Sequence, residues 1–155
     1  MCIRDRLIGS SIAHSIKKNQ VANEIIGFAK SEKTRKIAKN KKIVDTVVSK
    51  IDSRLSKADL IIICTPLSTY KRIFSSIKPF IKDGTVITDV GSAKTKSLLE
   101  VGSNAIEFIP AHPIAGTEQS GPNAGFSDLF INRWCIITPL PVSYTHLTLP
   151  TKRIV

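Results

Sequence analysis

Leu60-Ile61-Ile62-Ile63-Cys64 is a run of five apolar residues that Pro66 ends. A strand that is apolar on both faces is typical of a parallel sheet, because helices then cover both of its sides. Working outward, apolar and β-branched runs predict further strands at residues 24–28, 43–48, 85–90, 106–109 and 134–138. Helical spacing, capping residues and flanking Gly or Pro predict helices at residues 10–18, 31–40, 69–77, 94–101 and 122–130, and a helical turn at 53–57.

The alternation of strands and helices predicts the fold class. Strands separated by helices form βαβ units, whose strands pair in parallel. We therefore expect an α/β domain with a Rossmann-like, doubly wound, mostly parallel sheet, helices on both faces and a truncated first strand. Phe130 and Trp134 are expected in the core.

The composition is that of one globular domain with an excess of positive charge. The chain has 155 residues, is 42% hydrophobic and carries a formal net charge of +11. Its lysines are scattered with few aromatic residues among them, which does not favour nucleic acid as a partner but is compatible with a basic groove for an anionic substrate or cofactor. Cys64 and Cys135 lie in apolar runs without paired spacing, which indicates buried thiols in a reducing, cytoplasmic compartment. No apolar run approaches the roughly 18 residues of a membrane span, and no metal site is expected.

The two ends of the chain are predicted to be foreign to the domain. One codon choice for residues 1–5 has a reverse complement that translates as Val-Ser-Tyr-Thr-His, the sequence of residues 142–146. Such a relation suggests one inserted DNA element read in opposite directions, and it matches a transposase adapter used in preparing sequencing libraries. We therefore expect a native domain at residues 7–140, truncated at both ends, and a translated adapter at residues 1–6 and 142–155.

Two of the predicted strands end in residues suited to catalysis. Gly91 and Ser92 follow the strand at 85–90, and His112 follows the strand at 106–109. In an open α/β sheet, ligands bind in the crevice outside the carboxyl ends of the strands. A histidine held there can transfer protons near neutral pH. The alternatives are a structural histidine at a turn and a serine that caps a helix.

The segment Leu7-Ile8-Gly9-Ser10-Ser11-Ile12-Ala13 is similar to the tail of a dinucleotide fingerprint, in which the third glycine allows close helix–strand packing. If Gly9 is that glycine, the first two belong at positions 4 and 6, where this chain has Arg4 and Arg6. An ordinary capped turn is the alternative. The acidic residue expected about twenty residues later for the ribose is absent. Ala29-Lys30-Ser31 stands there, which leans toward NADP over NAD as the cofactor, with a solvated lysine-rich helix face as the alternative.

Four stretches occur in an order that resembles the prephenate dehydrogenase family, which includes arogenate and cyclohexadienyl dehydrogenases. They are residues 7–11, residues 88–94 (Thr-Asp-Val-Gly-Ser-Ala-Lys), residues 112–121 (His-Pro-Ile-Ala-Gly-Thr-Glu-Gln-Ser-Gly) and residues 129–134 (Leu-Phe-Ile-Asn-Arg-Trp). The resemblance covers nearly all of residues 7–140. It implies an oxidoreductase of tyrosine biosynthesis that uses NAD or NADP to decarboxylate prephenate oxidatively to 4-hydroxyphenylpyruvate, or arogenate to tyrosine.

The resemblance also implies roles for individual residues. His112 corresponds to the catalytic base that accepts the proton of the substrate hydroxyl, and Ser92 to the serine that orients this hydroxyl and His112. Thr117 and Glu118 belong, with these two, to the substrate site. The residues expected to contact the cofactor are Gly9, Ser10, Ser11, Ile12, Ala29, Lys30, Ser31, Cys64, Thr65, Pro66, Val90 and Gly91.

The chain also departs from the family pattern. The first strand and two glycines are replaced, and the C-terminal helical domain that carries dimer contacts and basic groups for the substrate carboxylates is missing. We therefore expect this chain to be inactive alone and its natural parent to be an active homodimer. Another Rossmann-fold hydroxyacid or imine dehydrogenase is an alternative, against which the His-Pro-Ile-Ala-Gly-Thr-Glu run argues. A non-catalytic nucleotide- or nucleic-acid-binding module is the alternative from a different class.

Overall fold

A six-stranded parallel sheet forms the centre of the molecule in the computed structural model, which describes residues 2–3, 6–93, 108–118 and 121–138. The strands lie in the spatial order β3-β2-β1-β4-β5-β6, and all neighbouring pairs in this sheet are parallel. The strands are β1 (Cys2–Ile3), β2 (Ile26–Phe28), β3 (Thr46–Val48), β4 (Leu60–Cys64), β5 (Val86–Asp89) and β6 (Phe108–Ile109). This order is that of a doubly wound Rossmann sheet, so the predicted fold class is confirmed.

The central strand is the short β1. Cys2 pairs with Phe28 of β2 and with Ile63 of β4, and Ile3 pairs with Cys64. These two residues belong to the terminus that the sequence analysis assigns to an adapter, and they fill the middle of the sheet. The strand order reverses between β1 and β4, which is the point where an open α/β sheet offers a crevice for ligands.

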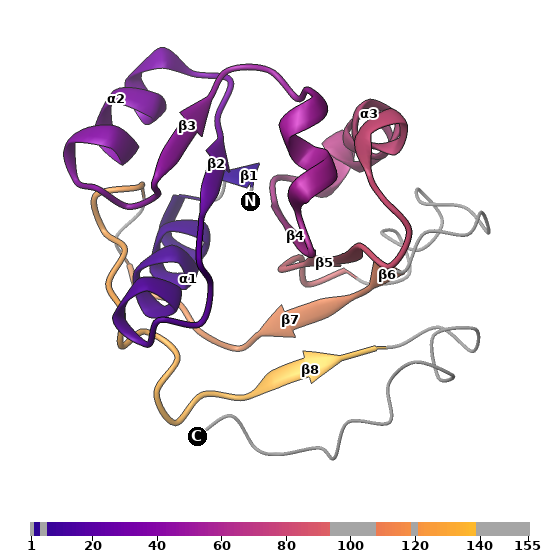
Figure 1. The fold of residues 1–155 in the computed structure, drawn as a ribbon. Coiled ribbons are helices and arrows are strands. Elements are labelled where there is room, and N and C mark those ends of the chain that lie inside the picture. The colour runs from indigo at the N-terminus through magenta and orange to yellow at the C-terminus, as the bar shows by residue number, and fades with distance from the viewer. Residues whose placement is uncertain (1, 4–5, 94–107, 119–120, 139–155) are drawn as a thin grey trace.

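Among the residues that the structure describes, the helices are α1 (Arg6–Lys18), α2 (Glu32–Asn40) and α3 (Tyr70–Ile77), and the 3₁₀ turns are η1 (Ser53–Lys57), η2 (Leu67–Thr69) and η3 (Lys78–Phe80). In Figure 1, α1 and α2 lie on the left of the sheet and α3 lies on the right. The helices predicted at 10–18, 31–40 and 69–77 are confirmed, and α1 begins earlier than predicted, at Arg6. The helix predicted at 94–101 lies outside the described residues.

Two separate hydrophobic clusters show how the helices are held. Ala13 of α1 and Ala38 of α2 pack in one cluster with Ile43. The other cluster joins apolar residues of α3 to β4, β5 and β6; it consists of Ile61, Ile63, Tyr70, Ile73, Phe74, Ile77, Ile87 and Phe108. In the buried strand β4, Ile61 and Ile63 are two residues apart and therefore point to the same face of the sheet, toward α3.

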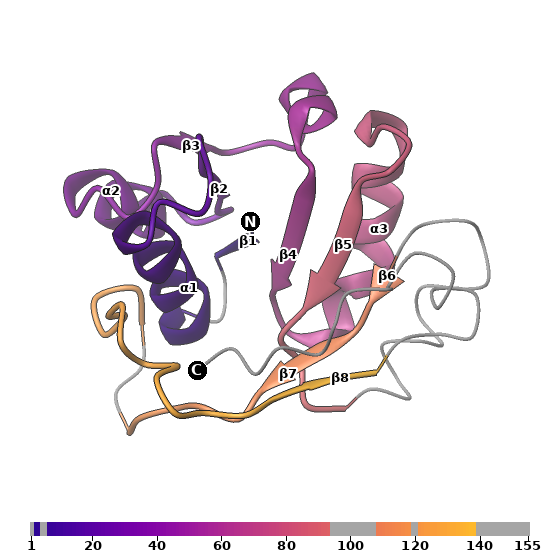
Figure 2. The ribbon, with the colours of Figure 1, turned by 60° about the horizontal axis from the view of Figure 1, so that its bottom comes forward.

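A second, two-stranded antiparallel sheet follows the parallel one. It pairs β7 (Ala111–Pro113) with β8 (Cys135–Ile137), and His112 lies opposite Ile136. In Figure 2 this ribbon runs below the arrowheads of β4 and β5. The strand predicted at 134–138 therefore exists, but it joins β7 instead of the parallel sheet. The expected burial of Trp134 and Cys135 is wrong, because Trp134 is 69% exposed and the Cys135 thiol is exposed as well.

The helix predicted at 122–130 is also wrong, since this segment forms turns. Gly121 has a φ of 106°, and the Ala124 amide donates to the Gly121 carbonyl in a tight turn. The Phe126 amide then donates to Ser11 Oγ of α1 at 3.2 Å, a bond that replaces a helical partner. Packing against α1 therefore overrides the local helical pattern.

Candidate active site

The end of β5 is organised by Asp89, whose side chain is fully buried. Asp89 Oδ2 accepts a hydrogen bond from the Tyr70 hydroxyl at 2.8 Å and another from the Gly91 amide at 3.1 Å. Asp89 Oδ1 accepts from the amide of Ala111 at 3.1 Å. A buried carboxylate is costly unless it is hydrogen-bonded, and these donors offset that cost. The chain that leaves β5 and the chain that enters β7 therefore meet at one side chain.

Gly91 is the residue that allows the chain to turn so closely around Asp89. A Cβ atom at this position would lie 3.0 Å from Asp89 Oδ2 and 3.2 Å from the Tyr70 hydroxyl. Its amide bonds the side chain two residues earlier, which is the arrangement of an Asx turn. The glycine thus permits the turn that presents Ser92, which is exposed.

His112 is half-buried in β7, beside the same end of β5. Its Nδ1 lies 3.4 Å from the carbonyl oxygen of Val90. A carbonyl oxygen can only accept, so this contact is a hydrogen bond when the imidazole carries its proton on Nδ1. In that tautomer Nε2 is the atom that accepts a proton. The predicted segments 89–92 and 111–113 are therefore adjacent, and the histidine lies within a strand and not at a turn.

The remaining predicted substrate residues lie further along the chain. Thr117 and Glu118 are both exposed in the segment that follows β7. Their assignment to the substrate site stays a prediction.

A cleft of about 720 Å³ opens at the carboxyl ends of β2, β3 and β4. Four of the predicted cofactor residues line it, namely Ala29, Lys30, Ser31 and Thr65. Thr65 follows β4, and the neighbouring strand β5 ends beside His112. The cleft and the histidine thus lie at the carboxyl ends of neighbouring strands, where ligands bind in this class of sheet.

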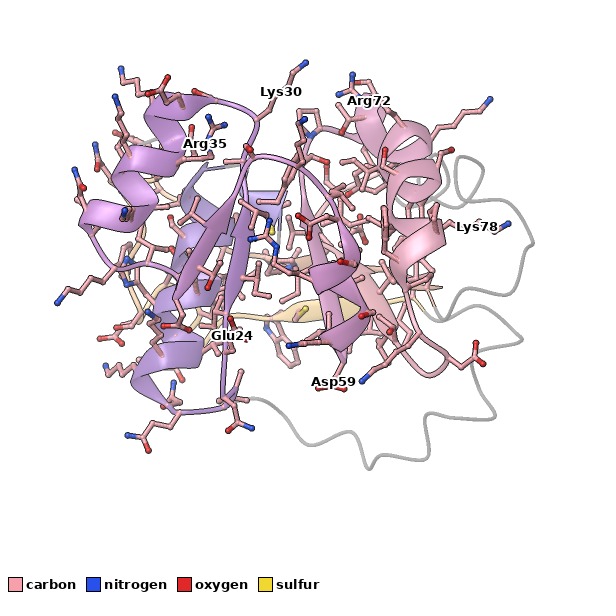
Figure 3. The ribbon with its side chains drawn as sticks, turned by 45° about the horizontal axis from the view of Figure 1, so that its top comes forward. Glu24, Lys30, Arg35, Asp59, Arg72 and Lys78 are labelled. Atoms are coloured by element: carbon pink, nitrogen blue, oxygen red, sulfur yellow. The ribbon has the colours of Figure 1, made fainter. Side chains whose placement is uncertain are left out.

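The electrostatic character of the cleft is basic. Lys30 lines it from the β2–α2 connection, Lys50 from the segment after β3 and Arg72 from α3, and none of its lining residues is acidic. In Figure 3, Lys30 and Arg72 lie at the same edge of the molecule, one on the β2–α2 connection and the other on α3. Ser31 is the N-cap of α2, and its side chain makes no capping hydrogen bond. Its hydroxyl and the positive end of the α2 dipole therefore suit a phosphate group.

Arg35 fixes the backbone that follows β2. Its Nη1 donates to the carbonyls of Ala29 at 2.9 Å and of Lys30 at 2.6 Å. These bonds fix the backbone from which Lys30 and Ser31 project. Arg35 therefore stabilises part of the cleft lining without lining the cleft itself.

The other predicted cofactor residues lie elsewhere. Gly9, Ser10, Ser11 and Ile12 are within α1 and do not line the cleft. The Ser10 and Ser11 side chains are fully buried, with Ser10 Oγ donating to the Leu7 carbonyl and Ser11 Oγ accepting from Phe126. The Ser10 bond lies within α1, the Ser11 bond joins α1 to Phe126, and both side chains are buried away from the surface.

Among the strand-end residues, Cys64 is fully buried and Pro66 is exposed beside the cleft residue Thr65. Val90 and Gly91 are half-buried at the end of β5, where Val90 contacts His112. These residues fall into two groups, one at the cleft and one at the histidine.

Sequence reasoning missed four residues of this region. The signal for Asp89 was available, because an acidic residue two positions before a glycine at a strand end is typical of an Asx turn. Tyr70, Lys50 and Arg72 carry no such signal. Lys50 and Arg72 reach the cleft only because the sheet order brings α3 and the segment after β3 to the same place, and Tyr70 reaches Asp89 from the start of α3.

Away from this site, α1 carries one perturbed histidine. Burial, together with the positive charges of Lys41 and Lys17, lowers the pKa of His14 from 6.5. The described residues hold no group of three or more His, Cys, Asp or Glu side chains arranged to bind a metal. In the same part of the chain, no helix has both the length and the apolar character needed to cross a membrane.

Comparison with known proteins identifies the family. The profile described as "Prephenate dehydrogenase, nucleotide-binding domain" matches residues 12–147. Cyclohexadienyl dehydrogenase of Zymomonas mobilis is 34% identical over 135 residues, which are 86% of this chain and 46% of that protein. Prephenate dehydrogenase of Lactococcus lactis is 36% identical over 138 residues, which are 85% of this chain and 38% of that protein. The chain thus spans less than half the length of these relatives.

Solved structures agree in fold. The arogenate dehydrogenase of Synechocystis superposes with a TM-score of 0.80 at 28% identity, over 88% of this chain and 48% of that one. The prephenate dehydrogenase of Aquifex aeolicus in complex with hydroxyphenyl propionate and NAD+ gives a TM-score of 0.74 at 23% identity, over 87% of this chain and 48% of that one. The parallel sheet with a basic cleft, the histidine beside β5 and the extent of these matches lead to one conclusion: the chain belongs to the prephenate dehydrogenase family and forms its nucleotide-binding domain.

Proposed function

We propose that the protein carrying this chain oxidises and decarboxylates prephenate or arogenate with NAD or NADP as the hydride acceptor. The observation that carries this proposal is the position of the His112 imidazole at the end of β5, next to the strand whose end opens on the basic cleft. Membership of the family supports the reaction class. The names of the relatives, which include prephenate, arogenate and cyclohexadienyl dehydrogenases, support the substrate class.

The residues of this chain account for the proton in this reaction. His112 Nε2 accepts the proton of the ring hydroxyl while Nδ1 stays hydrogen-bonded to Val90, which keeps the imidazole in the required tautomer. Ser92, at the exposed end of the adjoining turn, orients the same hydroxyl. The bound cofactor supplies the hydride acceptor, and the substrate leaves as an aromatic product and carbon dioxide. A positioned base of this kind contributes about 10²–10⁴-fold to the rate.

The cleft residues fit the anionic part of a dinucleotide. Lys30, Lys50 and Arg72 offer three cations, and Ser31 offers an uncommitted capping hydroxyl at the start of α2. A ribose 2′-hydroxyl is usually recognised by a carboxylate at this place, whereas a 2′-phosphate needs basic groups. We therefore assign a preference for NADP to this cleft, with the pyrophosphate and nicotinamide directed toward β4 and β5.

The complete activity is assigned to a longer protein. The relatives are more than twice as long as the matched segment. We therefore propose that residues outside this chain bind the substrate carboxylates, and that the longer protein dimerises through contacts outside this chain. The chain itself supplies the cofactor cleft and the base. We expect it to bind NADPH without turning over prephenate.

The decisive test is a steady-state assay of the full-length protein in which this chain is extended by its genomic flanking sequence. Prephenate and arogenate are each offered with NAD and with NADP. The proposal predicts reduction of the cofactor, and a His112→Asn variant that loses about 10²-fold or more of kcat while binding NADPH normally. Equal turnover of His112→Asn and the parent removes His112 from the mechanism.

The cofactor preference has its own test. Lys30→Ala and Arg72→Ala should each weaken NADPH binding about tenfold or more, because each removes a charged partner of the phosphate, and should leave NADH binding unchanged. Lys78→Ala is the matched control, since Lys78 is an exposed cation at the far end of α3 and does not line the cleft. Fluorescence titration of the 155-residue chain measures all of these affinities. An equal loss for NADH and NADPH contradicts recognition of the 2′-phosphate.

A further inference from the structure

We propose that Asp89 is a positioning residue that fixes the two catalytic segments relative to each other. Its Oδ1 accepts from the amide of Ala111, the residue before His112, at 3.1 Å. Its Oδ2 accepts from the amide of Gly91, the residue before Ser92, also at 3.1 Å. One carboxylate therefore holds the backbone next to each of the two side chains to which the proposed function assigns the chemistry.

Tyr70 donates a third hydrogen bond to the Asp89 carboxylate. The tyrosine is fully buried at the start of α3 and donates to Asp89 Oδ2 at 2.8 Å. Its ring is set against Phe74 in an edge contact with a centroid distance of 6.3 Å, and Phe74 contacts Phe108 in the same way at 5.2 Å. The Tyr70 bond thereby joins α3, which is anchored in the core, to the carboxylate, whereas the two backbone contacts of Asp89 are those that connect the catalytic segments.

The geometry of His112 depends on this anchor. β7 pairs with β8 through three residue pairs, and the described contacts from β5 reach it through Ala111 and His112. The Ala111 amide is hydrogen-bonded to Asp89. His112 Nδ1 lies 3.4 Å from the carbonyl oxygen of Val90, the residue that follows Asp89. Loss of the Ala111–Asp89 hydrogen bond would let β7 move away from β5. The contact between His112 Nδ1 and Val90 O, which is already long, would then lengthen further. Asp89 thereby sets the tautomer and direction of a ring that it does not touch in any described contact.

Asp89→Asn is the sharpest perturbation of this arrangement. An amide keeps one oxygen and gains an NH₂ group, which cannot accept, whereas amide donors face both oxygens of the native carboxylate. Either orientation of the amide therefore abolishes one of the two backbone contacts. Tyr70→Phe is the matched control, because it removes a hydrogen bond to the same carboxylate and leaves both backbone contacts intact.

The readout is the protonation state of the His112 ring nitrogens, measured by long-range ¹H–¹⁵N NMR on the 155-residue chain. We expect an Nδ1–H signal for His112 in the parent and in Tyr70→Phe, and its loss or exchange broadening in Asp89→Asn. Thermal melting of both variants controls for stability. In the full-length enzyme, Asp89→Asn should lower kcat about 10²-fold with little change in the KM for cofactor, since a displacement of about 1 Å costs this much.

A second variant guards against a misfolded Asp89→Asn. Gly91→Ala keeps the charge of Asp89 but puts a methyl group 3.0 Å from its Oδ2, so the carboxylate must move. It should weaken the His112 Nδ1–H signal as well. The inference is overturned if folded Asp89→Asn or Gly91→Ala retains the parent signal, or if Tyr70→Phe loses it equally. The inference rests on the proposed role of His112, but the NMR signal does not require turnover, so an inactive enzyme with the expected tautomer contradicts only the proposed function.

Discussion

The contact between α1 and residues 121–128 yields the most demanding prediction. A Cβ atom at Gly125 would lie 2.0 Å from Ser10 Oγ, 2.7 Å from Ser10 Cβ and 3.0 Å from the backbone nitrogen of Ser11. A rotation of the serine side chain relieves only the first of these overlaps. Gly125→Ala therefore forces the segment away from the helix, and the Phe126 amide loses its bond to Ser11 Oγ.

The expected cost follows from these contacts. Overpacking against a backbone costs about 1–3 kcal/mol, and loss of one hydrogen bond adds about 1 kcal/mol. We expect the free energy of unfolding to fall by about 2–4 kcal/mol, measured from urea denaturation of the 155-residue chain with an unchanged m-value. Gly125 does not have a positive φ, so the effect is steric and not conformational.

Gly116→Ala is the control. A Cβ atom at Gly116 meets nothing within 4 Å, and this glycine also lacks a positive φ. The change should leave stability within about 1 kcal/mol of the parent, with any gain coming from the unfolded chain. If Gly125→Ala is as stable as Gly116→Ala, the close packing of residues 121–128 on α1 is refuted.

Three further changes test separate parts of the structure. Burial and two lysines lower the pKa of His14 below 6.5, so the unfolded chain binds this proton more tightly than the folded chain does. The free energy of unfolding should therefore fall as the pH drops below 6.5. His14→Gln should flatten that slope in denaturation curves taken from pH 8 to pH 5. Gly84 has a φ of +79° with nothing near its Cβ position, and Gly84→Ala should therefore lower the free energy of unfolding by about 1–2 kcal/mol from backbone strain alone, whereas no loss would contradict the left-handed turn. Ile63 is fully buried between β4 and α3, and Ile63→Ala should cost about 2–5 kcal/mol in the same assay, whereas a loss below 1 kcal/mol would place it outside the core.

The parts of the fold that the sequence predicts well are those that local pattern determines. The run Leu60–Cys64 is apolar on both faces, and it forms the buried strand β4 beside the crevice. Helices with clear apolar spacing, such as α2 and α3, also appear where expected. Periodicity reports burial, and burial fixes these elements.

The errors arise where tertiary contacts outweigh local preference. Residues 122–130 have a helical pattern, but Gly125 must pack on Ser10 and the segment follows α1 instead. Trp134 is expected in the core because it is a large aromatic residue, yet it precedes a short antiparallel strand whose residues are all exposed. The alternative of a histidine at a turn before Pro113 is not found, because pairing with Ile136 places His112 in a strand.

Part of the candidate site could also be predicted from the sequence. His112 and the Ala29-Lys30-Ser31 run stand out in the sequence, and in the structure they lie beside the end of β5 and directly after β2. Asp89 was passed over although it comes just before Gly91 and Ser92, because its role depends on Ala111, 22 residues later. Arg72 could be found only once the sheet order brought α3 to the cleft.

The role of His112 as the base can be observed in a crystal structure of the full-length protein with NADP and a non-reacting substrate analogue. We expect His112 Nε2 and the Ser92 hydroxyl both to lie within hydrogen-bonding distance, about 2.6–3.2 Å, of the analogue's ring hydroxyl, with Nδ1 turned to Val90. A structure in which the imidazole points away from the analogue, or in which the nucleotide lies outside the cleft that carries Lys30 and Arg72, would contradict it.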